Sequence, residues 1–159
     1  MNARLNTCAA IVASPWQGIA VAVHLREQAL VNIDFVAEAF APEPQIDLAV
    51  EVVRQLHCYF NQANFHFSLP IAPSGTDFQQ RVWAAMLAIA PGQTASYADL
   101  ARHLNTSPRA IGGACRANPI PIVIPCHRVV SKTGLGGFMG EVSGDALRLK
   151  KLLLDHEAN

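Results

Sequence analysis

Residues 96–118 read SYADLARHLNTSPRAIGGACRAN and contain two predicted helices joined by a short polar turn. Ser96 is placed to cap the first helix, because a serine oxygen accepts hydrogen bonds from the free amides of a helix start. Ser107 caps the second helix, and Pro108 suits its first helical position. Two short helices joined in this way are typical of a helix-turn-helix.

A further helix is predicted before this pair. Thr76 and Gln79 form the T-x-x-Q pattern of a capping box at the start of TDFQQRVWAAMLAIA, and the following PGQ ends the helix. Residues 71–159 are therefore predicted to form one mostly helical domain.

Residues 1–70 predict a small α/β domain without obvious chemistry. Three apolar segments separated by turn residues predict strands, and a later segment with a periodic apolar face predicts a helix. FHFSLPIAPSG predicts a last strand that runs into a linker. The three earlier strand segments are TCAAIVASPW, GIAVAVHLR and ALVNIDFVAEAF, and the helical segment is IDLAVEVVRQLHCYFNQAN.

The composition excludes several classes of protein. The chain has 159 residues, of which 51% are hydrophobic, and its net charge is zero. No apolar run approaches the roughly 20 residues that span a bilayer, and the N-terminus has no signal-peptide pattern, so we expect a cytoplasmic protein without a membrane segment. The four cysteines are widely spaced and contain no CxxC motif, so we expect free thiols: Cys8, Cys58, Cys115 and Cys126.

Charge is unevenly distributed along the chain. Residues 1–75 contain three basic and six acidic side chains, whereas residues 76–159 contain nine basic and six acidic ones. Within residues 78–132, six basic side chains stand against Asp99 alone. Such a basic field suits a phosphate backbone, although the charge alone favours an ordinary solvated surface.

The second helix of the pair is unusually thin. Each of its two interior glycines costs about 1 kcal/mol relative to alanine, and small residues recur along one stripe. One interpretation is close packing against another helix, and the other is a backbone pressed into a narrow groove, with Arg109 and Arg116 reaching phosphates or bases. The short side chains suit the minor groove better than sequence reading in the major groove. The small residues are Ala110, Gly112, Gly113, Ala114 and Ala117.

The segment NPIPIVIPCHRVV, residues 118–130, places a thiol beside two charged or titratable groups. PIVIPC predicts a buried strand ended by Pro125. Cys126 differs from an ordinary core cysteine because His127 and Arg128 follow it directly. In an extended segment neighbouring side chains point to opposite sides, so His127 would act on the thiol through water. His127 needs an acceptor that orients it, and Glu157 in the predicted C-terminal helix LKKLLLDHE is a candidate. The sequence alone leaves this acceptor open among Asp145, Asp155 and Glu157.

The cysteine and histidine spacing does not indicate a metal site. Cys8, His24, Cys58 and the Cys126–His127 pair match no compact ligand spacing, so we expect neither a metal nor another cofactor.

The residues around Cys126 resemble a known family. PCHRV, the upstream RAIGGACRANPIPIVI and the segment GTDFQQRVWAAMLAIAPGQTASYADLA resemble the O6-alkylguanine-DNA alkyltransferases, or methylated-DNA–protein-cysteine methyltransferases. The resemblance covers about residues 70–157 and extends loosely to residues 1–70, which in that family form a variable ribonuclease-H-like α/β unit. It implies a helix-turn-helix, winged-helix-like alkyltransferase domain over residues 71–159.

The resemblance implies a role for each residue of the reaction site. Cys126 would accept the alkyl group, and His127 and Glu157 would form a Glu–His–water–Cys relay that delivers the thiolate. Tyr97 would donate a proton to the guanine ring as it leaves, and Asn118 would brace the hydrogen bonds of the site.

It also implies how the substrate is held. The backbone of Cys126 and Val129 and the loop near Gly140 would line the guanine pocket, and Lys150 matches a family lysine near the site. The segment FMGEVSGDALRLK, residues 138–150, is a few residues longer than the commonest family pattern.

Double-stranded DNA containing O6-alkylguanine would be the partner of a monomeric protein. Arg109 would enter the base stack and fill the space of a flipped nucleotide, while the helix from Pro108 lies in the minor groove. The helix would contact DNA through Ala110, Gly112, Gly113 and Arg116.

The residue types fit this chemistry. A soft thiolate attacks the alkyl carbon, and guanine leaves readily only when it is protonated, which gives Tyr97 a role as general acid. The base must leave the stack, at a cost of about a few kcal/mol. Because a thioether is not easily hydrolysed, each molecule would act once. Whether O4-alkylthymine is also repaired is left open.

Three other interpretations remain. A non-enzymatic alkyl-lesion binder of the same fold would have tryptophan in place of Cys126. A cysteine hydrolase or acyltransferase would turn over repeatedly and would not need the thin helix. A helix-turn-helix regulator with an incidental cysteine would bind DNA regardless of alkylation.

Overall fold

The structure, a computed structural model, describes residues 7–37 and 43–159. The chain divides into two compact units, Met1–Ser74 and Gly75–Asn159, and we describe each unit separately. The fold is mixed α/β, with a small antiparallel sheet and five α-helices among the described residues. None of the helices in these residues is long and apolar enough to cross a bilayer.

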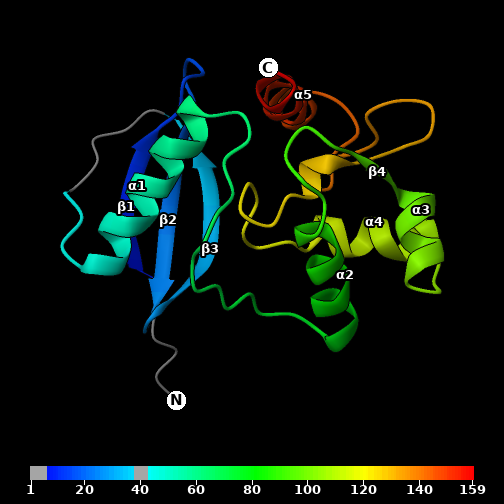
Figure 1. Ribbon diagram of the computed structural model, residues 1–159, viewed down its shortest axis with the longest axis horizontal. Helices are drawn as coiled ribbons and strands as arrows, with labels where there is room; N and C mark the ends of the chain where they lie inside the picture. The colour runs from blue at the N-terminus through cyan, green and yellow to red at the C-terminus, as the bar shows by residue number, and fades with distance from the viewer. Residues whose placement is uncertain (1–6, 38–42) are drawn as a thin grey trace. The chain divides into compact units, whose positions relative to one another are not determined.

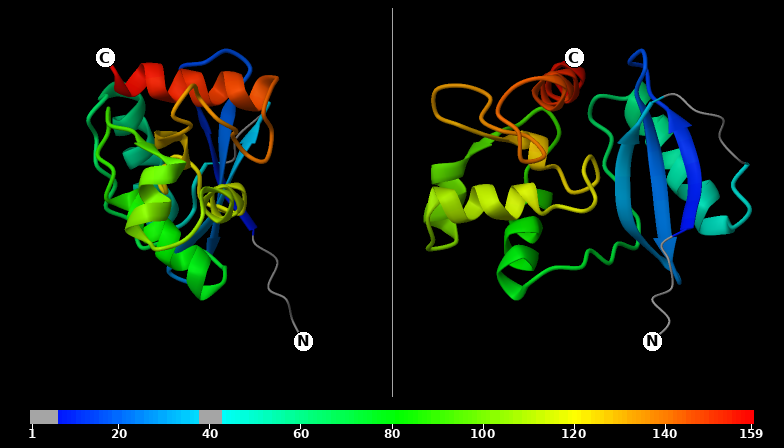
Figure 2. Two further views of the ribbon diagram at one scale, coloured as in Figure 1. Left: turned by 90° about the vertical axis from the view of Figure 1, so that its right-hand side faces the viewer. Right: turned by 180° about the vertical axis from the view of Figure 1, so that it is seen from behind.

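The first unit is a three-stranded antiparallel sheet with one helix. Strands β1 (Thr7–Ala13), β2 (Ala20–Arg26) and β3 (Ala29–Val36) pair in the order β1-β2-β3. Helix α1 (Asp47–Asn61) lies across one face of this sheet (Figures 1 and 2) and buries its apolar stripe there. The three predicted strands and the predicted helix are confirmed, apart from residues 38–40, which lie outside the described residues.

The strand predicted in FHFSLPIAPSG is wrong. The described backbone makes only an isolated bridge between Ile71 and Leu30, supported by a hydrogen bond of 2.9 Å from the Leu30 amide to the Pro70 carbonyl. Pro70 and Pro73 have no amide hydrogen and cannot donate to a longer ladder.

The second unit is mostly helical. Helix α2 packs on α4, α3 packs on α4, and α5 packs on the short 3-10 helix η1 (Figures 1 and 2). A two-residue parallel pair joins β4 to β5, so that the start of α3 is fixed beside the end of η1. The elements are α2 (Asp77–Leu87), β4 (Ala95–Ser96), α3 (Tyr97–His103), α4 (Pro108–Arg116), η1 (Cys126–Arg128), β5 (Val129–Val130) and α5 (Asp145–Glu157).

Local capping chemistry positions the three predicted helix starts of this unit. Thr76 and Gln79 form the predicted capping box. The Ser96 hydroxyl accepts from the Asp99 amide at 3.0 Å, and the Ser107 hydroxyl caps α4. The helix starts predicted from these residues are confirmed.

The buried strand predicted before Cys126 is also wrong. Residues 119–124 form turns, and Cys126–Arg128 form a 3-10 helix. Three prolines, at 119, 121 and 125, remove the donors that a ladder would need. The apolar side chains of the segment are nevertheless buried, because a compact turn can fill a core as well as a strand can.

Asn118 holds this turn together. Its side-chain amide donates to the Ile124 carbonyl at 2.8 Å, and its side-chain oxygen accepts from the Ile120 amide at 3.0 Å. Between these residues, Ile122 has a φ of 71° and is 1% exposed. A β-branched residue with a positive φ is strained, so the buried contacts and the Asn118 bonds stabilise an unfavourable backbone just before Cys126.

Candidate active site

Helix α4 presents its glycines to open space. A Cβ built on Gly112 or Gly113 would meet no described heavy atom within 4 Å beyond their chain neighbours and the backbone of α4 itself. Packing therefore does not require these glycines. Ala114 is buried instead, and its carbonyl accepts from Trp83 Nε1 at 2.9 Å. The predicted stripe of small residues therefore does not form one surface. Its glycine faces open space, whereas Ala114 is part of the core.

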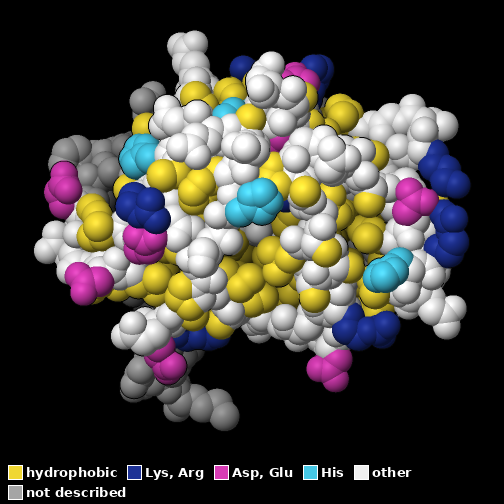
Figure 3. All heavy atoms as spheres, viewed as in Figure 1, with side chains coloured by type: hydrophobic (Ala, Val, Ile, Leu, Met, Phe, Trp, Pro, Cys, Tyr) yellow, Lys and Arg dark blue, Asp and Glu magenta, His cyan; other side chains and the backbone are white. Residues whose placement is uncertain are grey.

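Basic side chains accompany this open face. Arg109 and Arg116 are exposed on α4, and on the face drawn in Figure 3 a few further Lys and Arg side chains lie around α3. Arg128 does not belong to this surface, because it is 6% exposed. Without it, five basic side chains in residues 78–132 still stand against Asp99.

The thiol of Cys126 is deeply buried. The residue is 6% exposed and begins η1, where the Asn118 turn ends. Burial raises the pKa of the Cys126 thiol, and a hydrogen bond with Asn118 and the charge of Lys150 oppose this rise. The thiol therefore needs a base to become a thiolate at neutral pH.

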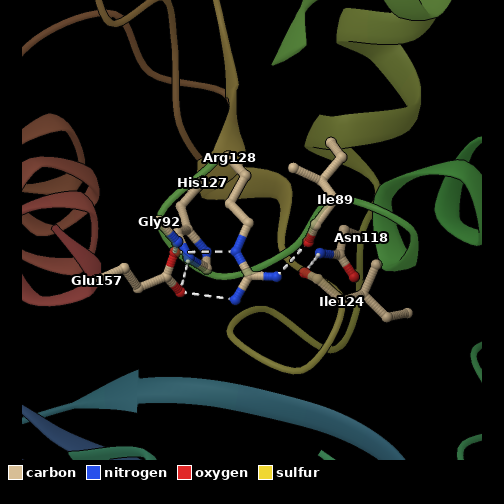
Figure 4. A network of polar contacts seen from close by, with 7 residues as sticks. All are labelled: Ile89, Gly92, Asn118, Ile124, His127, Arg128 and Glu157. Atoms are coloured by element: carbon tan, nitrogen blue, oxygen red, sulfur yellow. Dashed lines mark hydrogen bonds and ion pairs between the residues drawn. The ribbon is translucent and has the colours of Figure 1, made fainter. Parts of the chain in front are cut away.

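A buried charged cluster lies next to the thiol in sequence (Figure 4). His127 Nε2 is 2.7 Å from Glu157 Oε1. Arg128 donates to both carboxylate oxygens of Glu157, from Nε at 2.9 Å and from Nη2 at 2.8 Å, and its Nη1 donates to the Ile89 carbonyl at 2.6 Å. Among the three acids left open, the structure brings Glu157 to His127, whereas Asp155 pairs with Lys151 at the surface.

The contact with Glu157 determines which ring nitrogen of a neutral His127 carries the hydrogen. Burial lowers the pKa of the imidazole, although the bond to Glu157 opposes this shift. Burial is also the largest single influence on Glu157, but the hydrogen bonds from His127 and Arg128 outweigh it and hold its pKa well below its usual range. Since an ionised carboxylate only accepts, His127 Nε2 donates to it, and Nδ1 carries the lone pair. Nδ1 is buried and has no partner among the described residues.

Tyr97 and Lys150 meet at one backbone carbonyl. The Tyr97 hydroxyl donates to the Gly137 carbonyl at 3.3 Å, and Lys150 Nζ donates to the same oxygen at 2.9 Å. Lys150 also donates to the Val129 carbonyl at 2.6 Å. Burial lowers the pKa of Lys150 to about 8 and is the main reason that the pKa of Tyr97 rises to about 12. Tyr97 therefore keeps its proton at neutral pH.

A pocket of about 370 Å³ opens beside these groups. Its lining includes residues of α3, α4 and the loop before α5 that were predicted for the site. Cys115 also lines the pocket, although the sequence indicated no role for this residue. Cys126 does not line the pocket, but its charge contributes to the raised pKa values of Tyr97 and Cys115. The lining includes Tyr97, Gly112, Cys115, Arg116, Met139 and Gly140.

A tight turn forms one wall of the pocket. Phe138 and Glu141 exchange backbone hydrogen bonds of 2.8 and 3.0 Å, and the two residues between them, Met139 and Gly140, have positive φ values of 52° and 82°. A Cβ on Gly140 would lie 2.7 Å from Nε of Arg116, so the glycine lets the arginine lie against the turn. The predicted DNA contact Arg116 and the predicted pocket residue Gly140 are thus neighbours.

Two functional features were missed by sequence reasoning. Arg128 was counted as part of a surface field, although a charge that follows a buried thiol should have indicated a buried acidic partner. Gly137 contributes only a carbonyl oxygen, and no side-chain signal in the sequence could have revealed it.

Comparisons with known proteins identify the family of the chain. The profile of the 6-O-methylguanine DNA methyltransferase, DNA binding domain, matches residues 77–159. This chain is 39% identical over 138 residues to the methylated-DNA–protein-cysteine methyltransferase of Haemophilus influenzae, covering 79% of this chain and 76% of that one. The chain belongs to the O6-methylguanine-DNA methyltransferase family.

Further members of the methyltransferase family are also similar to this chain. The methylated-DNA–protein-cysteine methyltransferase of Archaeoglobus fulgidus is 42% identical over 105 residues, which cover 65% of this chain and 71% of that one. A crystal structure of the Mycobacterium tuberculosis OGT in complex with DNA superposes with a TM-score of 0.71 at 32% identity, covering 87% of this chain and 86% of that one. The range matched to the methyltransferase family contains Tyr97, the α4 face, Cys126 and Glu157.

Proposed function

We propose that this protein repairs DNA by transferring the alkyl group of O6-alkylguanine to its own Cys126. The thiol proton passes to His127, the sulfur attacks the alkyl carbon, the carbon–oxygen bond breaks, and guanine leaves with a proton donated by Tyr97. Tyr97 recovers a proton after the transfer, so that overall a proton replaces the alkyl group on guanine. The product is a thioether, so each molecule acts once. The observation that carries this proposal is a buried thiol directly followed by an imidazole whose outer nitrogen is bonded to a buried carboxylate.

His127 is the base in this scheme. Its Nδ1 lone pair takes the proton of Cys126 through one bridging water, while Glu157 holds the ring and stabilises the imidazolium that forms. The prediction that the thiol and imidazole do not touch rested on an extended strand, which is absent. The water relay is now supported by a different observation, the buried Nδ1 that lacks a partner among the described side chains and backbone.

Tyr97 is the general acid for the leaving guanine. It is half-buried at the pocket and keeps its proton at neutral pH. Lys150 holds the Gly137 and Val129 carbonyls, and so fixes the backbone that we expect to contact the base. Gly140 leaves room in the pocket wall, and Asn118 fixes the turn that presents Cys126.

Helix α4 is the proposed DNA-binding element. We propose that its open glycine face enters the minor groove of double-stranded DNA and that Arg109 occupies the space of the flipped nucleotide. Ala110, Gly112, Gly113 and Arg116 would contact the groove. The exposed arginines and the empty space above Gly113 support this assignment.

We extend the proposal to the finer classification of the protein. Residues 1–70 would be a ribonuclease-H-like unit and residues 71–159 a winged-helix-like domain, acting as a monomer in the cytoplasm without a cofactor. The two helices α3 and α4, joined by a short turn at residues 104–107, support the second assignment.

Intact-protein mass spectrometry after exposure to an oligonucleotide containing O6-methylguanine tests the function. We expect a gain of one methyl group, mapped to Cys126, and no gain in Cys126→Ala. Repeated turnover, or methylation of Cys115 instead, would refute the proposal.

A further inference from the structure

The alkyl-transfer scheme gives no role to Arg128, although every nitrogen of its guanidinium is engaged in a polar contact of the site. It is a cation with 6% exposure. Its guanidinium makes three hydrogen bonds to Glu157 and Ile89, of 2.6 to 2.9 Å. A buried charge with such complete pairing is costly to maintain, which raises the question of what it does there.

The two oxygens of Glu157 are shared unequally. Oε1 accepts from His127 Nε2 and from Arg128 Nη2, while Oε2 accepts from Arg128 Nε at 2.9 Å and from the Gly92 amide at 3.5 Å. Arg128 therefore reaches both oxygens, and His127 reaches one. The negative charge of the Glu157 carboxylate is already balanced by the Arg128 guanidinium, so no positive charge on His127 is needed (Figure 4).

We propose that Arg128 is a positioning residue that keeps His127 neutral, and thus able to accept the proton of Cys126. With Arg128 present, the cluster of guanidinium, carboxylate and neutral imidazole carries no net charge. The thiol proton then moves to His127 inside the site, and no proton has to be exchanged with solvent.

Without Arg128 the same cluster would behave differently. A buried carboxylate that has lost the guanidinium favours a proton on the imidazole that is bonded to it, as in any buried ion pair. His127 would then be an imidazolium in the resting protein, with no lone pair to offer. The thiol proton would have to leave to solvent, and the site would carry a net negative charge afterwards.

Other charged groups act on His127, but they are common to all variants compared below. Lys150 of α5 is a second cation that opposes protonation of His127. Its ammonium is bonded to the Val129 and Gly137 carbonyls instead of Glu157. Lys150 therefore cannot replace Arg128 as the counter-charge of the carboxylate.

The first test measures the protonation state directly, without any alkyl transfer. Imidazole nitrogen shifts in NMR spectra, assigned with His127→Gln, should show His127 neutral at pH 7 in the wild-type protein. They should show it protonated in Arg128→Met. A protonated His127 in the wild-type protein overturns the proposal, even if the variant does not fold.

The second test uses the reaction with free O6-benzylguanine and rests on the proposed function. The wild-type rate should stay flat across neutral pH, because burial lowers the pKa of His127 and raises that of Cys126. The Arg128→Met rate should be reduced at pH 7 and should rise about tenfold per pH unit. A uniformly lower but flat profile would indicate a merely structural role and would overturn the proposal.

Two further variants complete the design. Arg128→Met combined with Glu157→Gln removes both charges, so His127 should again be neutral and the profile flat. A steep profile in this double variant contradicts the proposal. Lys151→Met removes an exposed cation that pairs with Asp155 at 2.6 Å on the same helix, and should leave the rate and its pH profile unchanged. If no protein is alkylated at all, the proposed function fails, whereas the NMR result still decides the role of Arg128.

Discussion

Helix α4 and the 3-10 helix η1 both combine arginine with small or reactive residues, yet they treat charge in opposite ways. In α4, Arg109 and Arg116 are exposed, and a Cβ added to Gly112 or Gly113 would meet no described atom within 4 Å outside the helix and the chain neighbours. In η1, Arg128 and His127 are buried and bonded to one carboxylate. Helix α4 is therefore accessible to a large partner, whereas the charged groups of η1 are enclosed and can act only in proton transfer.

This difference separates two tasks that lie close together in the sequence. Exposed arginines interact with phosphates at long range and tolerate many sequences. A buried cluster interacts strongly but only with groups held at fixed positions. Changes in η1 and its partner should therefore affect the chemical step on any substrate, whereas changes on the open face of α4 should affect the reaction with duplex DNA and not the reaction with a free base.

The largest effect is expected for Glu157→Ala. This change leaves the buried guanidinium of Arg128 without its counter-charge, which should lower the free energy of unfolding by about 3–5 kcal/mol. Urea unfolding monitored by circular dichroism measures the change. Asp155→Ala is the matched control on the same helix, because its exposed pair with Lys151 contributes only about 0–1 kcal/mol. Equal losses in both variants would remove the distinction between buried and exposed charge.

Arg109→Ala should affect only the duplex reaction. If this side chain fills the space of a flipped base, its loss should slow repair of a duplex containing O6-methylguanine on the order of 10- to 100-fold. The rate with free O6-benzylguanine should stay the same, because no base has to be flipped. Single-turnover assays on the two substrates make the comparison. An equal loss on both would place Arg109 in the chemical step.

Acidification should weaken the closed cluster in two stages. The pKa of buried His127 is lowered, so the unfolded chain binds a proton first as the pH falls below about 6.5, and the free energy of unfolding decreases. The pKa of Glu157 is also lowered, so its contribution is complete above about 4.5 and is lost as the pH falls further. Urea unfolding at a series of pH values measures both stages. In Glu157→Gln the second stage should be reduced, and an unchanged profile would contradict the assignment.

The smallest effect is expected for Gly113→Ala, with opposite signs for stability and function. The added methyl group meets open space, so the variant should be more stable by about 0.5–1 kcal/mol through helix propensity. The same methyl group should thicken the face of α4 and weaken reaction with duplex DNA, while free O6-benzylguanine reacts normally. Thermal unfolding and the two-substrate assay test this pair of expectations. Faster repair by the more stable variant would argue against a groove-bound helix.

The sequence predicted those features that depend on neighbouring residues. Thr76, Ser96 and Ser107 revealed three helix starts, because capping is a contact between residues three positions apart. The segment before Cys126 was assigned to a strand, because buried turns and buried strands have the same apolar composition. The prolines of this segment, which cannot donate to a strand ladder, indicate a turn instead.

The residues of the site could be predicted from the sequence, but the contacts between them were harder to predict. Sequence reasoning left the partner of His127 open among three acids, because the choice depends on how α5 packs against η1. It also counted Arg128 among surface charges, since burial of a charged side chain depends on a partner 29 positions away. The roles of Tyr97 and Arg109 stay predictions.

The burial of Cys126 has a consequence for how the protein survives until it is needed. Cys8 is exposed, and Cys58 and Cys115 are partly exposed, whereas Cys126 is enclosed and holds its proton. Electrophiles and oxidants that diffuse in solution should therefore consume Cys8 first and Cys126 last. Burial thus keeps Cys126 unmodified until a substrate is bound in the site, which matters for a protein that can act only once.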